Sequence, residues 1–152
     1  MLDLLLAIGH HLLIFAIFGI ICAEFWAVRP GMSSTTVARV ASLDLWYGIW
    51  ATAVIVVGFC RAIFAAKGWG YYSINGFFWA KMAAFAAVGL LSIVPTVRII
   101  SWRRTLAKNA AFAPAGGDIL KVRRFLWAEV AFFALIPACA AAMARGYGSF
   151  AH

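Results

Sequence analysis

The sequence predicts an all-α integral membrane protein, built as a four-helix bundle. Of its 152 residues, 66% are apolar and 12% are charged, whereas about 25% are charged in an ordinary soluble domain. A soluble chain of this length has too little interior to bury so many apolar side chains. Four stretches reach the length of about 20 mainly apolar residues that a membrane-spanning helix needs. We therefore expect residues 1–152 to form a single transmembrane domain.

The first two spans are expected at about 3–28 and 42–64. In the first span, Leu4–Ala23 carries no charged residue, and a Pro-Gly pair soon follows its end. In the second span, the segment between Asp44 and Arg61 is uncharged. The polar stretch 33–36, rich in serine and threonine that favour helix starts, is expected to link the two spans.

The third and fourth spans are expected at about 77–99 and 121–144. A glycine-broken aromatic stretch at 67–76 precedes the third span, and a basic connector at 101–120 precedes the fourth. Both spans contain residues that are unusual in lipid, because charges are costly there and proline removes a backbone donor. These residues are Lys81 and Pro95 in the third span, and Glu129 and Pro137 in the fourth.

The distribution of basic residues predicts how the bundle is oriented. Four spans place both termini on one side, where Arg61, Lys67 and Arg145 are the nearest cations. Cytoplasmic segments are enriched in Lys and Arg, so we expect both termini in the periplasm and a multi-pass protein of the bacterial inner membrane. No nucleic-acid recognition element accompanies the charge, so nucleic acid is not an expected partner. The cations on the other side are Arg29, Arg39, Arg98, Arg103, Arg104, Lys108, Lys121, Arg123 and Arg124.

Ionisable residues within the spans predict an outer polar layer. From the helical rise, His10, Lys81 and Arg61 lie roughly 9, 10 and 12 Å outward of the middle of their helices. His11, Met82 and Met143 belong to the same half. An imidazole is a good ligand for haem iron or copper, and the two cations can neutralise the propionates of a tetrapyrrole. Alternatively, Arg61 extends to the headgroups and Lys81 bonds backbone carbonyls.

A second, inner polar layer is expected from Glu24, Asp44, Glu129 and Arg98. Seven-residue steps drift by only about 20° around a helix, so His10, Ile17 and Glu24 share one stripe with polar ends and an apolar middle. Two interpretations of the inner layer stay open: a structural ion network and a proton path.

Several motifs resemble a bacterial family of small four-helix inner-membrane proteins of unknown function. They cover nearly the whole chain and include Gly9-His10-His11, Asp44-Leu45-Trp46-Tyr47-Gly48, Lys67-Gly68-Trp69, Phe78-Trp79-Ala80-Lys81 and Trp127-Ala128-Glu129. More distantly, the histidine of the first span and the Trp-x-Lys of the third are similar to HemJ-type protoporphyrinogen oxidases and CopD-type copper-resistance proteins. The HemJ likeness implies haem b binding and catalytic roles for His10 (or His11) and Lys81. The ending Glu24-Phe25-Trp26 departs from that family.

The expected function is therefore a membrane redox protein that binds haem b and oxidises protoporphyrinogen IX with quinone as acceptor. His10 is the expected axial ligand, Lys81 and Arg61 hold propionates, and His11 or Met143 is a second ligand. One alternative is a copper-binding or copper-transport protein that uses His10, His11, Met82 and Met143. Another is a cofactor-free accessory subunit of a membrane complex. Expected partners are the lipid bilayer, a porphyrin or quinone, and further copies or subunits.

Overall fold

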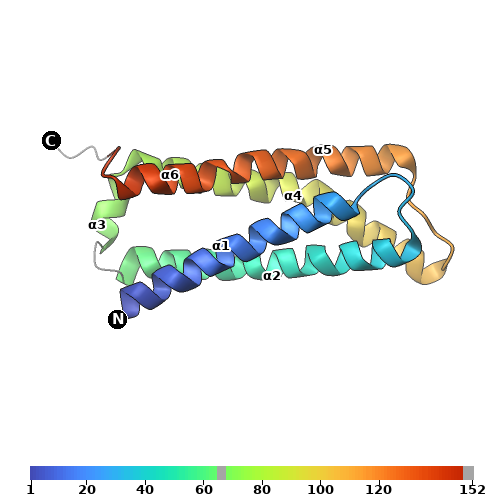
Figure 1. The fold of residues 1–152 in the computed structure, drawn as a ribbon, viewed down its shortest axis with the longest axis horizontal. Coiled ribbons are helices and arrows are strands. Elements are labelled where there is room, and N and C mark those ends of the chain that lie inside the picture. Colours follow the sequence, from blue (N-terminus) through green and yellow to red (C-terminus); the bar gives the residue numbers. More distant parts are fainter. Residues whose placement is uncertain (65–67, 149–152) are drawn as a thin grey trace.

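The computed structural model describes residues 1–64 and 68–148 and is dominated by long helices joined by short links (Figure 1). Four helical stretches are long and apolar enough to cross a membrane, which confirms the predicted all-α membrane fold. The fourth stretch, Gly116–Ala144, consists of two successive helices. The elements are α1 (Leu2–Ala27), α2 (Ser34–Phe64), α3 (Gly68–Ser73), α4 (Gly76–Lys108), α5 (Gly116–Phe133) and α6 (Leu135–Ala144).

The outer surface of the bundle is apolar, as a protein in lipid requires. Phe15, Leu90 and Trp127 expose 71%, 69% and 63% of their surface. Large apolar side chains exposed on several spans would be unfavourable in water and are favourable in hydrocarbon. The chain is thus a membrane protein in contact with the lipid bilayer.

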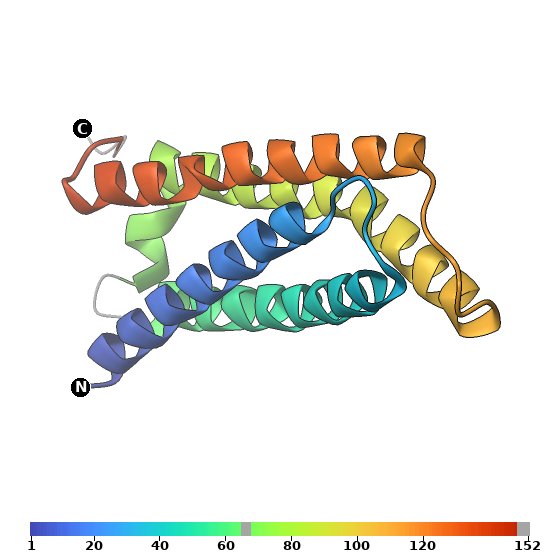
Figure 2. The same cartoon turned by 45° about the vertical axis from the view of Figure 1, so that its right-hand side comes forward.

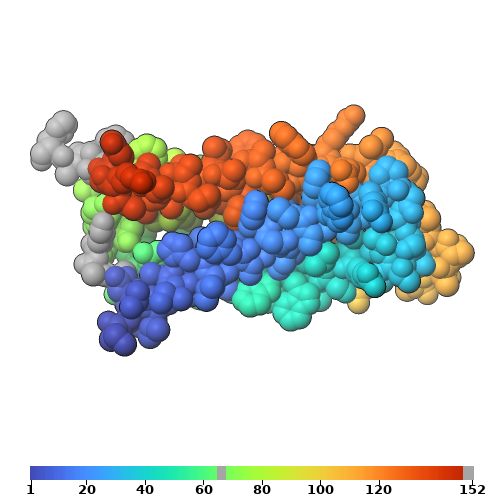
Figure 3. Space-filling view, in the orientation of Figure 1, coloured from blue at the N-terminus to red at the C-terminus, as the bar shows by residue number. Residues whose placement is uncertain are grey.

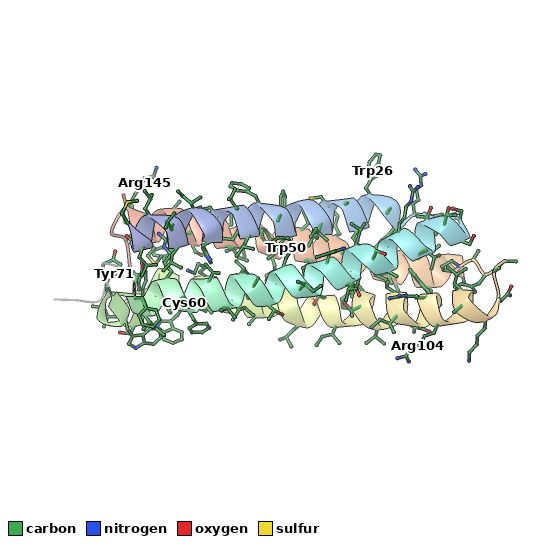
Figure 4. All side chains as sticks on the ribbon, turned by 90° about the horizontal axis from the view of Figure 1, so that it is seen from below. Trp26, Trp50, Cys60, Tyr71, Arg104 and Arg145 are labelled. Atoms are coloured by element: carbon green, nitrogen blue, oxygen red, sulfur yellow. The ribbon has the colours of Figure 1, made fainter. Side chains whose placement is uncertain are left out.

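The four spans run back and forth along one axis, so the two ends of the described chain lie together (Figure 1). We call the end that holds Leu2, α3 and Ala144 the terminal end. We call the end that holds the links 28–33 and 109–115 the basic end. Figure 4 shows Arg145 at the first of these ends and Arg104 at the second. The expected Lys67 lies outside the described residues.

Helix α2 begins at Ser34, well before the expected start near 42. The Oγ of Ser33 accepts a hydrogen bond from the backbone N–H of Thr36 at 3.3 Å, which caps the helix. Val37 and Val40 are fully buried on the first turns. The polar stretch 33–36 is therefore mostly helix, because one buried face suffices to hold a helix outside the apolar run.

The basic connector expected at 101–120 is much shorter in the structure. Helix α4 continues to Lys108 and α5 begins at Gly116, which leaves only 109–115 as a link. Trp102 and Ile119 are buried on these extensions, at 3% and 1% exposure. Apolar run length underestimates both helices, since their added turns bury one side and leave basic residues on the other.

Two apolar cores lie one after the other along the bundle. The basic-end core contains Val28, Met32, Val37, Val40, Ala41, Ile99, Trp102, Ile119, Val122 and Leu126. The middle core contains Ile17, Ile21, Tyr47, Val54, Ala84, Val88, Phe133 and Ile136.

Proline has different consequences in the two spans that contain it. The fourth span breaks at Ala134, between α5 and α6, one turn before Pro137. The ring of Pro137 cannot donate to the carbonyl of Phe133 and crowds it, which accounts for the break. Pro95 instead lies buried within an uninterrupted α4.

Helix α1 packs unevenly along its length. It packs closely against α2 and α5, whereas within the described residues its Cα atoms stay more than 8 Å from those of α6. Figures 1 and 2 both show α1 diverging from α6 toward the terminal end. The bundle is consequently closed at the basic end and open on one side in its terminal half.

Arg123 of α5 fastens the end of α1 at the basic end. Its guanidinium donates to the carbonyl oxygens of Phe25, at 3.0 Å, and of Val28. The same group lies 4.5 Å from the centre of the Phe25 ring. These bonds satisfy carbonyls that have no partner at a helix C-terminus.

At the terminal end, Asn75 joins the start of α4 to the segment that follows α6. Its side-chain oxygen accepts from the N–H groups of Phe77 and Phe78, at 3.0 and 3.2 Å, and caps α4. Its amide donates to the carbonyl of Tyr147 at 3.1 Å, and it is fully buried. Gly148 has φ of +77°, and a Cβ there would meet the Phe77 ring at 2.5 Å. Only glycine fits at that position.

Candidate functional site

A cavity of about 650 Å³ occupies the terminal half of the bundle, where α1 and α6 diverge. We call it the outer cavity. Figure 3 shows a hollow between α1 and α6 on this side of the molecule. Most of the residues expected in the outer half line it, together with two tyrosines of α3: His10, His11, Arg61, Tyr71, Tyr72, Lys81 and Met143. The structure thus brings together residues from α1, α2, α4 and α6 that the sequence placed only at similar depths.

His10 lies half-buried at the inner side of the cavity and packs against α2. A Cβ on Gly58 would lie 3.1 Å from its Cε1 atom, so the imidazole rests directly on the glycine. Its Nδ1 atom is buried and has no hydrogen-bond partner. Buried polar atoms are nearly always satisfied, so this nitrogen marks a place where a partner is missing.

His11 is arranged differently. It is exposed on α1, and its Nδ1 lies 2.6 Å from the carbonyl oxygen of Ala7. A hydrogen bond from one ring nitrogen to a carbonyl commonly orients a histidine that binds metal through the other nitrogen. The two imidazole centres are 6.3 Å apart and nearly perpendicular.

The two cations of the cavity lack an acidic partner. Arg61 has a buried Nε without a hydrogen bond, and Lys81 has its ammonium 5.2 Å from the centre of the Phe78 ring. No Asp or Glu is among the residues that line the cavity. In the part of the chain that the structure describes, the ion pair found is Arg98–Asp118, at the basic end. Among the described residues, no acidic side chain therefore balances the positive charge of the outer cavity.

The sulfur ligands considered for copper are divided between two cavities. Met143 lines the outer cavity, whereas Met82 lines a smaller neighbouring one of about 60 Å³. His10 and Lys81 border both. Residues 1–64 and 68–148 contain no group of three His, Cys, Asp or Glu that could hold a metal ion.

The inner polar layer forms between the two apolar cores. Glu24, Asp44 and Glu129 are 2%, 8% and 1% exposed, and their charges act on one another. The Oγ1 of Thr96 donates to Asp44 Oδ1 at 2.6 Å. Ile17, between His10 and Glu24 on α1, is buried at 1% exposure, so the stripe has the predicted apolar middle.

Arg98 does not join this layer, contrary to expectation. Its guanidinium lies 3.6 Å from Asp118 in the first turn of α5, and both side chains are partly exposed. Residue 118 falls within the basic connector that was expected at 101–120. The earlier start of α5 puts this acid on a helix and within reach of Arg98.

Asn75 is a structural residue of the site that the sequence analysis did not single out. By capping α4 and binding Tyr147, it holds the start of the helix that carries Lys81 beside the end of α6. Tyr71 also reaches this end, and its hydroxyl donates to the Met143 carbonyl at 3.4 Å. The preference of asparagine for helix N-caps was the available signal.

Comparison with known proteins gives one match. The model of a family described as "Predicted membrane protein (DUF2214)" matches residues 2–148. No curated protein and no solved structure matches the chain. The likeness to HemJ-type and CopD-type proteins consequently rests on short motifs alone.

Proposed function

Because the chain belongs to the DUF2214 family of predicted membrane proteins, we propose that it is a membrane redox protein that binds haem b in its outer cavity. One observation carries the proposal: His10, Arg61 and Lys81 line a single cavity of about 650 Å³ whose lining includes no acid. Two cations without an acidic partner favour a ligand with carboxylates, and an imidazole on the same cavity favours a ligand with a metal. The volume lies within the range of about 300–1,000 Å³ that is common for cofactor sites.

The residues present fit such a group. Arg61 has a buried nitrogen that lacks an acceptor, and a propionate oxygen would supply one. Lys81 reaches the same cavity from α4, so two cations are available for two propionates. The aromatic side chains of Phe15, Phe18 and Phe133 provide apolar wall for a flat ring. When bound, haem supplies the electron-transfer chemistry, while the chain supplies binding and orientation.

Two histidines are candidates to bind the haem iron. His10 lies deeper, beside both cations, and its Nδ1 lacks a partner. His11 already has the carbonyl bond that orients a ligating imidazole. We propose His10 as the ligand because it is the one held at the depth of Lys81 and Arg61, with His11 or Met143 as the second ligand.

The proposed activity is the oxidation of protoporphyrinogen IX. The six hydrogens that leave protoporphyrinogen IX reduce three membrane quinones to three quinols, so electrons and protons balance. Protoporphyrinogen IX carries two propionates as haem does, so Lys81 and Arg61 would hold whichever of the two tetrapyrroles occupies the cavity. This activity follows the HemJ likeness of His10 and Lys81.

Copper binding is the second candidate, favoured by the presence of His10, His11 and Met143 among the residues that line the outer cavity. Nitrogen and thioether ligands suit copper. Since Met82 lies on the smaller cavity, the site would have to rely on Met143 alone for sulfur. A cofactor-free accessory subunit of an oligomer or membrane complex is the third.

The absorption spectrum of the purified protein distinguishes the three. Haem b gives a Soret band that His10→Ala abolishes and that the control Lys121→Ala, at the basic end, leaves unchanged. A Soret band that is lost in His11→Ala but kept in His10→Ala would mean that His11, and not His10, is the main ligand. A colourless protein whose copper content rises on copper addition favours the second candidate. A protein that binds neither and co-purifies with membrane subunits favours the third.

A further inference from the structure

We infer that the inner carboxylate layer, made of Glu24, Asp44 and Glu129, is a proton-binding site that holds protons at neutral pH. It is distinct from the outer cavity and does not depend on what that cavity binds.

The layer concentrates acid in a protein that has little of it. The chain has five acidic residues, and three of them meet here from α1, α2 and α5. The Glu24 and Glu129 side chains are 2% and 1% exposed, so neither reaches lipid headgroups or water. The Tyr47 phenol of α2 lies within electrostatic range of all three. Three negative charges at this place would repel one another strongly in a medium of low dielectric constant.

No cation of the described chain neutralises the layer. Arg98 of α4 is paired with Asp118, and Arg123 of α5 donates to backbone carbonyls of α1. Thr96 of α4 supplies a neutral donor to Asp44. The Oε1 atoms of Glu24 and Glu129 are buried without any hydrogen-bond partner. These two oxygens are therefore the atoms of the layer that no group of the described chain stabilises.

A proton is the ligand that this arrangement fits. Within residues 1–64 and 68–148 the acids form no group that could coordinate a metal ion. An unpaired buried carboxylate is so costly that the group takes up a proton instead of keeping its charge. One proton removes the charge of one carboxyl group without needing a coordination shell.

The apolar cores on either side make the layer a binding site and not a conducting path. Ile17 and Ile21, at 1% and 0% exposure, separate Glu24 from His10 along α1. The fully buried Val28 and Val40 belong to the core on the other side. Protonation therefore serves to keep three helices together, and ionisation would push them apart.

Infrared spectroscopy of the protein in nanodiscs tests this directly. We expect the carbonyl band of protonated carboxylic acid at neutral pH in the unaltered chain, where Asp3 and Asp118 are the other acidic side chains. Glu24→Gln and Glu129→Gln should each remove part of the band, whereas Asp118→Asn should leave it intact. Absence of the band, or its loss in Asp118→Asn, would overturn the inference. A band that vanishes only when sodium is present would assign the site to sodium and likewise overturn it.

Thermal stability gives a second measurement, which does not depend on assigning infrared bands in the variants. The folded layer holds protons that the unfolded chain releases above the ordinary carboxyl pKa of about 4, so stability should fall as pH rises from there through neutral. Glu24→Gln with Glu129→Gln should flatten this dependence, because a neutral amide replaces a neutral acid. A fall that is equally steep in the double variant would contradict the inference. Haem content, which tests the outer cavity, need not change in either experiment.

Discussion

Gly58 and His10 are in direct contact across the α1–α2 interface. The imidazole lies where a side chain on residue 58 would begin, with its Cε1 only 3.1 Å from a built Cβ. The absence of a side chain on α2 is thus what allows the histidine to lie between the helices.

Gly58→Ala should displace the His10 ring by a few tenths of an ångström. In an open helix position, Gly→Ala stabilises by up to about 1 kcal/mol, and Gly48→Ala, which meets nothing within 4 Å, should show this gain. Gly58→Ala should gain less, because the imidazole must move. Thermal unfolding in detergent measures both. Equal gains would mean that the ring is not held against α2.

Lys81→Gln and Arg61→Gln should each weaken haem binding by about tenfold or more, because each removes a charged partner for a carboxylate. Titration of the apoprotein followed by absorbance gives the affinity. Lys81→Arg should retain most of it. Lys121→Gln, an exposed cation of the basic end, serves as the control. Unchanged affinity in both cavity variants would refute the role of these cations.

Thr96→Val should destabilise the protein by about 1–3 kcal/mol, because it leaves a buried carboxyl oxygen of Asp44 without its donor. Thr52→Val is the matched control, since its hydroxyl bonds only the carbonyl of Gly48 on its own helix and is exposed. Chemical or thermal unfolding compares the two. A control that loses as much stability would show that the Asp44 bond has no special importance.

Asn75→Ala should cost about 0.5–2 kcal/mol from the lost helix cap, and more from the lost tie to Tyr147. Asn109→Ala is the control, because Asn109 is exposed and its side-chain oxygen accepts only from the N–H of Ala111 in a short link. The same unfolding experiment applies. Hydrogen exchange should also rise in the first turn of α4. Protection that stays the same there would argue against the cap.

The proposed orientation is testable by thiol labelling of intact cells. In a chain whose three native cysteines are replaced by alanine, Arg145→Cys should react with a membrane-impermeant reagent. Arg104→Cys should react only after the membrane is opened, because the positive-inside rule assigns the basic end to the cytoplasm. The reverse pattern would invert the bundle.

The sequence predicted the spans and the outer polar layer because both follow from hydropathy and from the rise of a helix. Depth alone placed His10, Lys81 and Arg61 at one level, and all three line the outer cavity. The predicted starts of α2 and α5 were too late in the chain. A helix continues wherever one of its faces is buried, as at Val37 and Ile119. Hydropathy does not record such a one-sided contact.

The partners of individual side chains could not be read from the sequence. The pairing of Arg98 with Asp118 depends on where α5 starts, and the bond from Asn75 to Tyr147 joins residues far apart in the chain. Whether Glu24 and Glu129 meet depends on how each helix is rotated about its axis. That rotation is set by contacts between helices and leaves no local signal.

The separation of α1 from α6 has a practical consequence for binding measurements. The hollow opens sideways between these two spanning helices (Figure 3), so we expect a guest to enter it from the bilayer and not from the aqueous phase. Occupancy should then scale with the amount of guest per lipid. Diluting a vesicle sample with buffer should change it little, whereas adding empty vesicles should draw the guest away.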